Sequence, residues 1–165
     1  MNDKNKVPVL KGLKMKIGIG SDHRGAGYKK LIIDILKQNN HKVVDYGADN
    51  KRVDYSDIAC RVAFAVTCKD IERAVLIGSI GSEMALTANK INGIRAVACF
   101  DDFHTRLARE KLDCNVLCLA GELTSEPLLD RIVRVWLATE PAKGRYIRRL
   151  SKIDAIEQAL NCSRL

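Results

Sequence analysis

The sequence predicts a single α/β domain in which helices cover both faces of a five-stranded parallel sheet. Short apolar runs alternate with amphipathic helical segments along the chain, which is the pattern of repeated βαβ units. No two-residue hairpin turn joins any pair of these runs, so neighbouring strands should be parallel. With 165 residues, of which 47% are hydrophobic, the chain can bury one such core. These features together predict a Rossmann-like, doubly wound, three-layer αβα fold.

Each element follows from local periodicity and from turn residues. In the first predicted helix, Tyr28, Leu31, Ile32, Ile35 and Leu36 recur on one face, as an amphipathic helix requires. Side chains that can cap helices precede three of the others: Asp54 or Ser56, Ser82, and the segment 124–127 with proline in its first turn. We expect strands at 16–20, 42–46, 74–77, 94–99 and 115–121, and helices at 28–36, 54–66, 82–90, 101–112 and 124–136.

A further helix follows the complete five-strand layer, after Pro141 and Gly144. It is extra to the αβα sandwich, so its apolar face has no sheet of its own to cover. A second copy of the chain can cover it instead, and we therefore expect a homodimer. The apolar stripe consists of Ile147, Leu150, Ile153, Ile156 and Leu160.

The net charge of +8 is concentrated in two segments. Residues 1–16 carry five lysines and one aspartate, and residues 143–152 carry five cations and no acid, which leaves the rest close to neutral. We interpret residues 1–14 as a basic N-terminal extension and residues 15–165 as the folded domain. Nucleic-acid binding through the extension is a weak alternative, because neither a known motif nor interleaved aromatic residues accompany it.

The six cysteines form no CxxC pair and have no histidine at zinc-ligand spacing, so we expect reduced thiols and no metal. The role of Cys99 has two alternatives, because this residue ends a predicted strand. It either supplies a thiol to the site or, as a small hydrophobe, belongs to the core. The chain shows neither a signal peptide nor a membrane span, and a cytoplasmic protein without membrane contacts is expected.

Three polar loops follow predicted strands. They are Asp22-His23, the segment 78–83 and the segment 99–102. Because ligands of doubly wound sheets bind outside the carboxyl ends of the strands, we expect the ligand site there. In the segment 78–83, Gly78 and Gly81 allow a tight turn whose backbone N–H groups can converge on a ligand oxygen.

A series of short motifs makes the chain similar to one known family from Met15 to about Ile153. The series is Gly20-Ser21-Asp22-His23, Val53-Asp54-Tyr55, Ala88-Asn89-Lys90, Gly93-Ile94-Arg95-Ala96, Arg106-Leu107-Ala108-Arg109-Glu110, Asn115-Val116-Leu117 and Gly144-Arg145 followed by Arg149. In this order and at these spacings the chain resembles the ribose-5-phosphate isomerase B and galactose-6-phosphate isomerase family.

The resemblance implies a homodimeric enzyme that interconverts an aldose phosphate and a ketose phosphate without a cofactor. It opens the sugar ring and moves a proton between C1 and C2. Such chemistry needs a base, hydrogen-bond donors for the enediolate and cations for the phosphate. Matching positions imply that His23, Arg145 and Arg149 anchor the phosphate and that Asp22 lies near the sugar hydroxyls.

Two segments depart from the family pattern. The family's loop Cys-Gly-Thr-Gly-Ile-Gly-Met is matched by Gly78-Ser79-Ile80-Gly81-Ser82-Glu83-Met84, so Gly78 stands where the proton-abstracting cysteine is usual. Family members without that cysteine use a glutamate at the position of Met84, one residue beyond Glu83. Lys111 stands where a histidine usually opens the ring, and a lysine with a pKa near ~10.4 transfers protons poorly at neutral pH.

The function expected from the sequence is aldose–ketose isomerisation of a sugar phosphate, with ribose 5-phosphate as the first choice of substrate. The alternative is a phosphosugar-binding or regulatory homodimer that has lost catalysis, since the anchors are kept while the catalytic residues differ. The candidate catalytic residues are Glu83, Lys111 and Ser79, and the candidate substrate-binding residues are Asp22, His23, Gly78, Gly81, Ser82, Arg145 and Arg149.

Overall fold

The computed structural model describes residues 14–47 and 52–162. The predicted basic extension, apart from Lys14, lies outside the described residues, as does most of the loop at 48–53. The strands are β1 (Lys16–Ser21), β2 (Lys42–Asp45), β3 (Arg73–Gly78), β4 (Ala96–Ala98) and β5 (Val116–Ala120). The helices are α1 (Ala26–Gln38), α2 (Tyr55–Thr67), α3 (Ser82–Ala88), α4 (Asp102–Leu112), α5 (Glu126–Ala138) and α6 (Arg145–Cys162).

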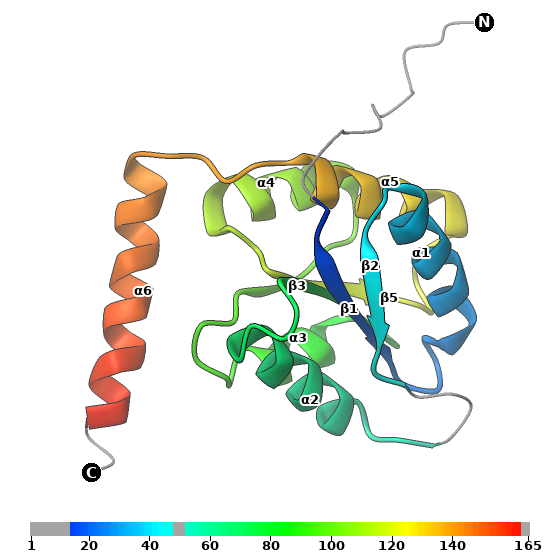
Figure 1. Ribbon diagram of the computed structural model, residues 1–165, viewed down its shortest axis with the longest axis horizontal. Coiled ribbons are helices and arrows are strands. Elements are labelled where there is room, and N and C mark those ends of the chain that lie inside the picture. Colours follow the sequence, from blue (N-terminus) through cyan, green and yellow to red (C-terminus); the bar gives the residue numbers. More distant parts are fainter. Residues whose placement is uncertain (1–13, 48–51, 163–165) are drawn as a thin grey trace, which may run out of the picture.

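The five strands form one parallel sheet in the order β2-β1-β3-β5-β4, as the sequence predicts. Helices α1, α4 and α5 lie on one face of the sheet, and α2 and α3 lie on the other (Figure 1). Strand β2 lies on one side of β1 in the sheet, and β3 lies on the other side. The order therefore reverses between β1 and β3, and such a switch point leaves a crevice at the carboxyl ends of the two strands.

Strict alternation along the central strands builds the two halves of the core. In β3, Val75 and Ile77 pack in one cluster with α1 and α5, whereas Ala74 and Leu76 pack in the other with α2 and α3. This follows from the two-residue period of a strand, whose successive side chains point to opposite faces. Both faces of β3 are buried, so the strand reads as a continuous apolar run.

Two helix boundaries differ from the predictions. The residue before α3 is Gly81, with φ 75° in the left-handed region, and Ser82 is already the first helical residue; the prediction that Ser82 caps the helix is wrong. A side chain at Gly81 would also press on the backbone of Leu119, whose carbonyl carbon lies 3.0 Å from the ideal Cβ position. Glycine is therefore required at position 81 for two reasons: the positive φ angle and the lack of room for a Cβ atom. The helix also ends at Ala88 instead of near Lys90.

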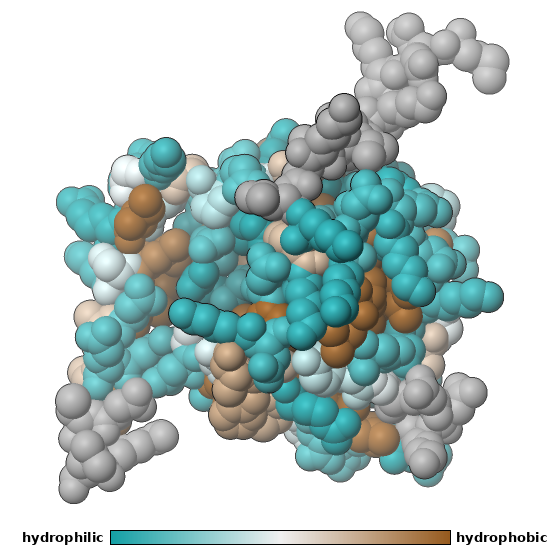
Figure 2. Space-filling view, in the orientation of Figure 1, coloured by the Kyte–Doolittle hydropathy of each residue, from teal (hydrophilic) through white to brown (hydrophobic). Residues whose placement is uncertain are grey.

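Helix α6 stands apart from the layered body (Figure 1). A hydrogen bond from the Gly93 backbone N–H to the Glu157 carboxylate, 2.9 Å long, ties it to the loop before β4. Much of its apolar stripe has no cover in one chain: Ile147, Ile153, Ile156 and Leu160 are each 44% to 60% exposed, and Figure 2 shows hydrophobic side chains along this helix. A stripe of this kind on a helix without a sheet marks an interaction surface.

Candidate active site

A cavity of about 360 Å³ opens where β1 and β3 end, which is the switch point of the sheet. The cavity brings together the loop after β1, the start of α2 and the turn between β3 and α3, so polar side chains from three separate segments meet in it. It is lined by Asp22, His23, Arg24, Val53, Asp54, Tyr55, Ser79, Ile80 and Glu83.

Asp22 is buried and shapes the loop that leaves β1. One of its carboxylate oxygens accepts hydrogen bonds from the backbone N–H groups of Arg24 and Gly25, both 2.9 Å long. The bonds turn the chain into α1 and leave the side chain of His23 exposed at the cavity. Asp22 thus holds the end of the strand and also lines the cavity.

The carboxyl group of Glu83 folds back over Gly78. One oxygen accepts a hydrogen bond from the Ile80 backbone N–H at 3.1 Å, and the other is buried without a hydrogen-bond partner. A Cβ atom built on Gly78 would collide with the first of these oxygens and lie 3.0 Å from Met84 Cγ. The Glu83 carboxyl group therefore fills the space that any side chain at position 78 would take.

Ser79 is held by the ion pair between Arg24 and Glu122. Its hydroxyl donates a 2.5 Å hydrogen bond to Glu122, and Arg24 contacts the other oxygen of that carboxylate at 2.8 Å. The hydrogen bond from Ser79 and the Arg24 guanidinium lower the pKa of Glu122. This link joins the loops after β1, β3 and β5, so the Ser79 hydroxyl positions the turn rather than standing free in the cavity.

The predicted residues on α4 and α6 lie apart from this cavity, whereas Gly78, Gly81 and Ser82 belong to the turn between β3 and α3 without lining it. Arg145 donates to the hydroxyl of Tyr146 at 3.0 Å, and the charges of Arg145, Lys111 and Arg149 all act on this phenol. We call Lys111, Arg145, Tyr146 and Arg149 the α4–α6 cluster. None of its members lines the cavity at β1 and β3, so one chain does not bring the predicted phosphate anchors on α6 to the predicted base.

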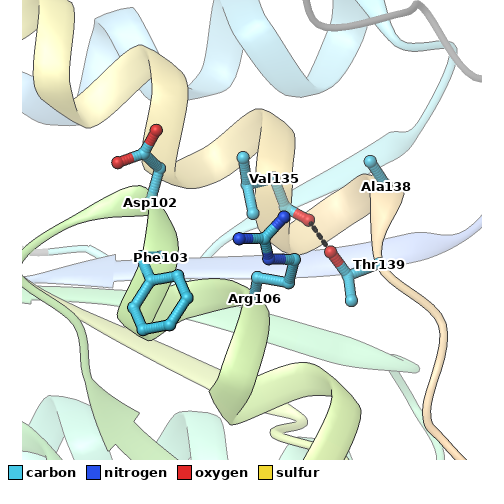
Figure 3. Close-up of a pocket in the computed structure, with 6 residues that line it drawn as sticks. All are labelled: Asp102, Phe103, Arg106, Val135, Ala138 and Thr139. Atoms are coloured by element: carbon cyan, nitrogen blue, oxygen red, sulfur yellow. Dashed lines mark hydrogen bonds between the residues drawn. The ribbon is translucent and has the colours of Figure 1, made fainter.

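The loop after β4 does not belong to the site. Cys99 is fully buried, and burial raises the pKa of its thiol to about 12, so it belongs to the core. Beyond it, Asp102 borders a separate cavity of about 230 Å³ between α4 and α5. Figure 3 shows Arg106 beside the Phe103 ring there, 5.4 Å from the ring centroid. That cavity contains none of the predicted site residues.

Several residues that line the cavity are not among the predicted site residues. Asp54 and Tyr55 stand in the motif 53–55, which carries the family resemblance and could have identified them. Asp54 precedes α2, and its side chain makes no capping hydrogen bond. Arg24 has no such signal, because its partner Glu122, which does not line the cavity, lies 98 positions further along the chain.

Among the residues that the structure describes, no group of three or more His, Cys, Asp or Glu side chains is arranged to hold a metal ion. Within the same residues, no helix has both the length and the apolar composition needed to cross a membrane.

The fold and the carboxylate-lined cavity at its switch point define a doubly wound α/β protein with an enzyme-like site. The sequence model of the family described as Ribose/Galactose Isomerase matches residues 17–153. Ribose-5-phosphate isomerase B of Escherichia coli (strain K12) is 35% identical over 147 residues, which cover 88% of this chain and 99% of that protein.

Solved structures agree. That of ribose-5-phosphate isomerase B from Clostridium thermocellum superposes with a TM-score of 0.86 at 39% identity, covering 88% of this chain and 99% of the other. That of Mycoplasma genitalium ribose-5-phosphate isomerase B with bound ribulose-5-phosphate gives a TM-score of 0.82 at 34% identity, covering 87% and 96%. The chain belongs to the Ribose/Galactose Isomerase family and is an isomerase.

Proposed function

We propose that this isomerase interconverts ribose 5-phosphate and ribulose 5-phosphate and that Glu83 is its proton-transferring base. The observation that carries the proposal is the position of the Glu83 carboxyl group above Gly78, with one oxygen lacking a partner. The resemblance puts the family's cysteine at position 78. The carboxylate therefore stands in the space of the missing side chain, although Glu83 is offset by one residue from the glutamate of other family members that lack the cysteine.

The reaction follows from this arrangement. Once the sugar ring is open, the Glu83 carboxylate takes the proton from C2 of the aldose and returns it to C1. In the enediolate between these steps, O1 gains the proton that O2 loses, which gives the ketose. The backbone of the Gly78–Ser82 turn contacts the reacting end of the sugar, and Ser79 fixes that turn through Glu122. Asp22 lies by the sugar hydroxyls, and His23 contacts the phosphate.

Two copies of the chain complete the site. The cavity contains Glu83, Asp22 and His23, whereas Arg145, Arg149 and Lys111 lie in the α4–α6 cluster of the same chain. The exposed apolar stripe of α6 is the surface through which a second copy would dock. Docking would bring the guanidinium groups of α6 to the cavity of the partner, where their planar forks suit a phosphate dianion. We propose a homodimer; its cytoplasmic location stays a prediction from the sequence.

The wild-type chain tests the function directly. A coupled assay should show ketose formed from ribose 5-phosphate, and enzyme treated with a chelator should be equally active. The related proteins lend no support to a non-catalytic phosphosugar binder. Measurements on the same protein sample distinguish an isomerase from such a binder. If ribose 5-phosphate raised the melting temperature while no ketose formed, the chain would bind without catalysing.

A further inference from the structure

The α4–α6 cluster places one phenol among three cations. The Tyr146 hydroxyl accepts the 3.0 Å hydrogen bond from Arg145 Nη2. The guanidinium carbons of Arg145 and Arg149 lie 5.0 Å and 5.9 Å from the ring centroid, and Lys111 approaches from the end of α4. The hydrogen bond from Arg145, together with the positive charges of Arg145, Lys111 and Arg149, favours the phenolate form and lowers the pKa of Tyr146.

A group that can give and take a proton is needed close to these cations. Ribose 5-phosphate is mostly a ring, and the ring oxygen must gain a proton when the ring opens. Only two carbons separate that oxygen from the phosphate ester oxygen, so a residue beside the phosphate anchors can reach it. The resemblance puts the usual ring-opening histidine at the position of Lys111, whose ammonium group is a poor proton shuttle. Tyr146 is the neighbouring group with a transferable proton.

We propose that Tyr146 is the acid–base residue that opens the sugar ring, an inference that rests on the proposed isomerase function. The bond between C1 and the ring oxygen breaks, and the Tyr146 hydroxyl gives its proton to that oxygen. The anomeric hydroxyl becomes the aldehyde carbonyl, and its proton passes to solvent. Solvent then reprotonates the phenolate, which Arg145, Arg149 and Lys111 stabilise in the meantime. Glu83 acts only afterwards, on the open chain.

Two reactions separate ring opening from proton transfer at carbon. Conversion of ribose 5-phosphate requires both. Exchange of the C1 hydrogen of ribulose 5-phosphate in deuterated water requires the base alone, because a ketopentose with a phosphorylated 5-hydroxyl cannot close a five-membered ring. The exchange can be followed by proton NMR spectroscopy on the full-length protein.

Replacing Tyr146 with phenylalanine removes only the hydroxyl. Tyr146→Phe should lower kcat for ribose 5-phosphate by about 10²- to 10³-fold, the usual size of an acid–base contribution, and leave the exchange rate within about 3-fold of wild type. Glu83→Gln should slow both reactions, by about 10²- to 10⁴-fold. Tyr28→Phe, which removes a phenolic hydroxyl from α1, serves as the control and should change neither.

The acid form of Tyr146 is the active one, so wild-type kcat for ribose 5-phosphate should fall as pH rises through the lowered pKa of the phenol, before the usual value near ~10. The rate of hydrogen exchange at C1 of ribulose 5-phosphate should not fall over the same pH range. Equal losses in both reactions, or a raised KM with unchanged kcat, would show that Tyr146 only binds phosphate and would overturn the proposal. Unchanged activity would overturn it as well. A wild-type chain without turnover or exchange would instead refute the isomerase function.

Discussion

At the scale of single residues, Gly78 and Glu83 are complementary, because the absence of a side chain at one makes room for the carboxyl group of the other. The buried, unpartnered oxygen of Glu83 is a costly feature in a folded protein, since an unsatisfied polar atom destabilises by roughly 1–3 kcal/mol. A proton acceptor that must stay available for a substrate has a reason to be left in this state. In the proposed mechanism, the pair replaces one cysteine side chain.

Substituting Gly78 with alanine tests this complementarity. The added methyl group would displace the Glu83 carboxyl group, so kcat for ribose 5-phosphate should fall at least 10-fold. The free energy of unfolding should fall by only about 1–2 kcal/mol, because the main obstacle is the end of a flexible side chain. Steady-state kinetics and urea unfolding measure the two effects.

Gly27 in α1 provides the matched control, since a methyl group there meets no atom within 4 Å. Gly27→Ala should stabilise the chain by about 0.5–1 kcal/mol through helix propensity and leave kcat unchanged. If Gly78→Ala kept full activity, the carboxyl group would not need the space above residue 78.

At the scale of elements, the last turn of α4 carries Lys111 of the α4–α6 cluster, and the residues around it determine where this helix ends. Arg109 is completely buried and contacts Asp113 at 2.7 Å. The other oxygen of Asp113 contacts Arg95, also at 2.7 Å. Asp113 ends the helix with φ 46° in the left-handed region, a conformation that aspartate and asparagine tolerate better than most residues. One carboxylate thus ends α4 and neutralises a buried guanidinium.

Asp113→Asn keeps the shape and the backbone conformation but leaves the Arg109 charge buried without its partner. We expect a loss of about 3 kcal/mol in the free energy of unfolding, the low end for breaking a buried pair. Asp130→Asn, which breaks the partly exposed pair with Arg134 in α5, should cost less than about 1 kcal/mol. Urea unfolding curves that placed both variants at the same stability would contradict the role of burial.

The elements also show what local sequence patterns can predict. The five strands and the helices on both faces were predicted because each carries its own periodicity. The loops after β1 and β3 were placed at the site because parallel strands end at one edge. The fold-back of Glu83 was not predictable, because helix geometry alone turns it away from the position of Met84 by about 100°. Its contact with Gly78 depends on the left-handed turn at Gly81. The same turn makes Ser82 a helical residue instead of a cap.

At the scale of the whole molecule, the predicted catalytic groups are divided between the cavity and the α4–α6 cluster, so activity and assembly should be coupled. Ile156 is 60% exposed on the apolar stripe of α6. Placing a charge there, as in Ile156→Glu, should dissociate the proposed dimer, because burying an unpaired carboxylate is strongly unfavourable. Turnover of ribose 5-phosphate should be lost along with the dimer. Sedimentation velocity and the coupled assay on the same sample measure both.

Gln158→Glu is the matched control on α6, because residues two apart on a helix differ by about 200° in direction. It adds the same charge to the opposite side of the helix and should leave the dimer and its activity intact. A fully active monomer of Ile156→Glu would show that one chain contains a complete site.

The turnover of Glu83→Gln shows whether the Glu83 carboxylate moves the proton in this isomerase. The variant keeps the size of the side chain but replaces the proton acceptor with an amide. Removal of a general base predicts that kcat for ribose 5-phosphate falls about 10²- to 10⁴-fold, while the melting temperature and its rise with ribose 5-phosphate stay close to those of wild type. A Glu83→Gln enzyme that converted ribose 5-phosphate at the wild-type rate would contradict the claim.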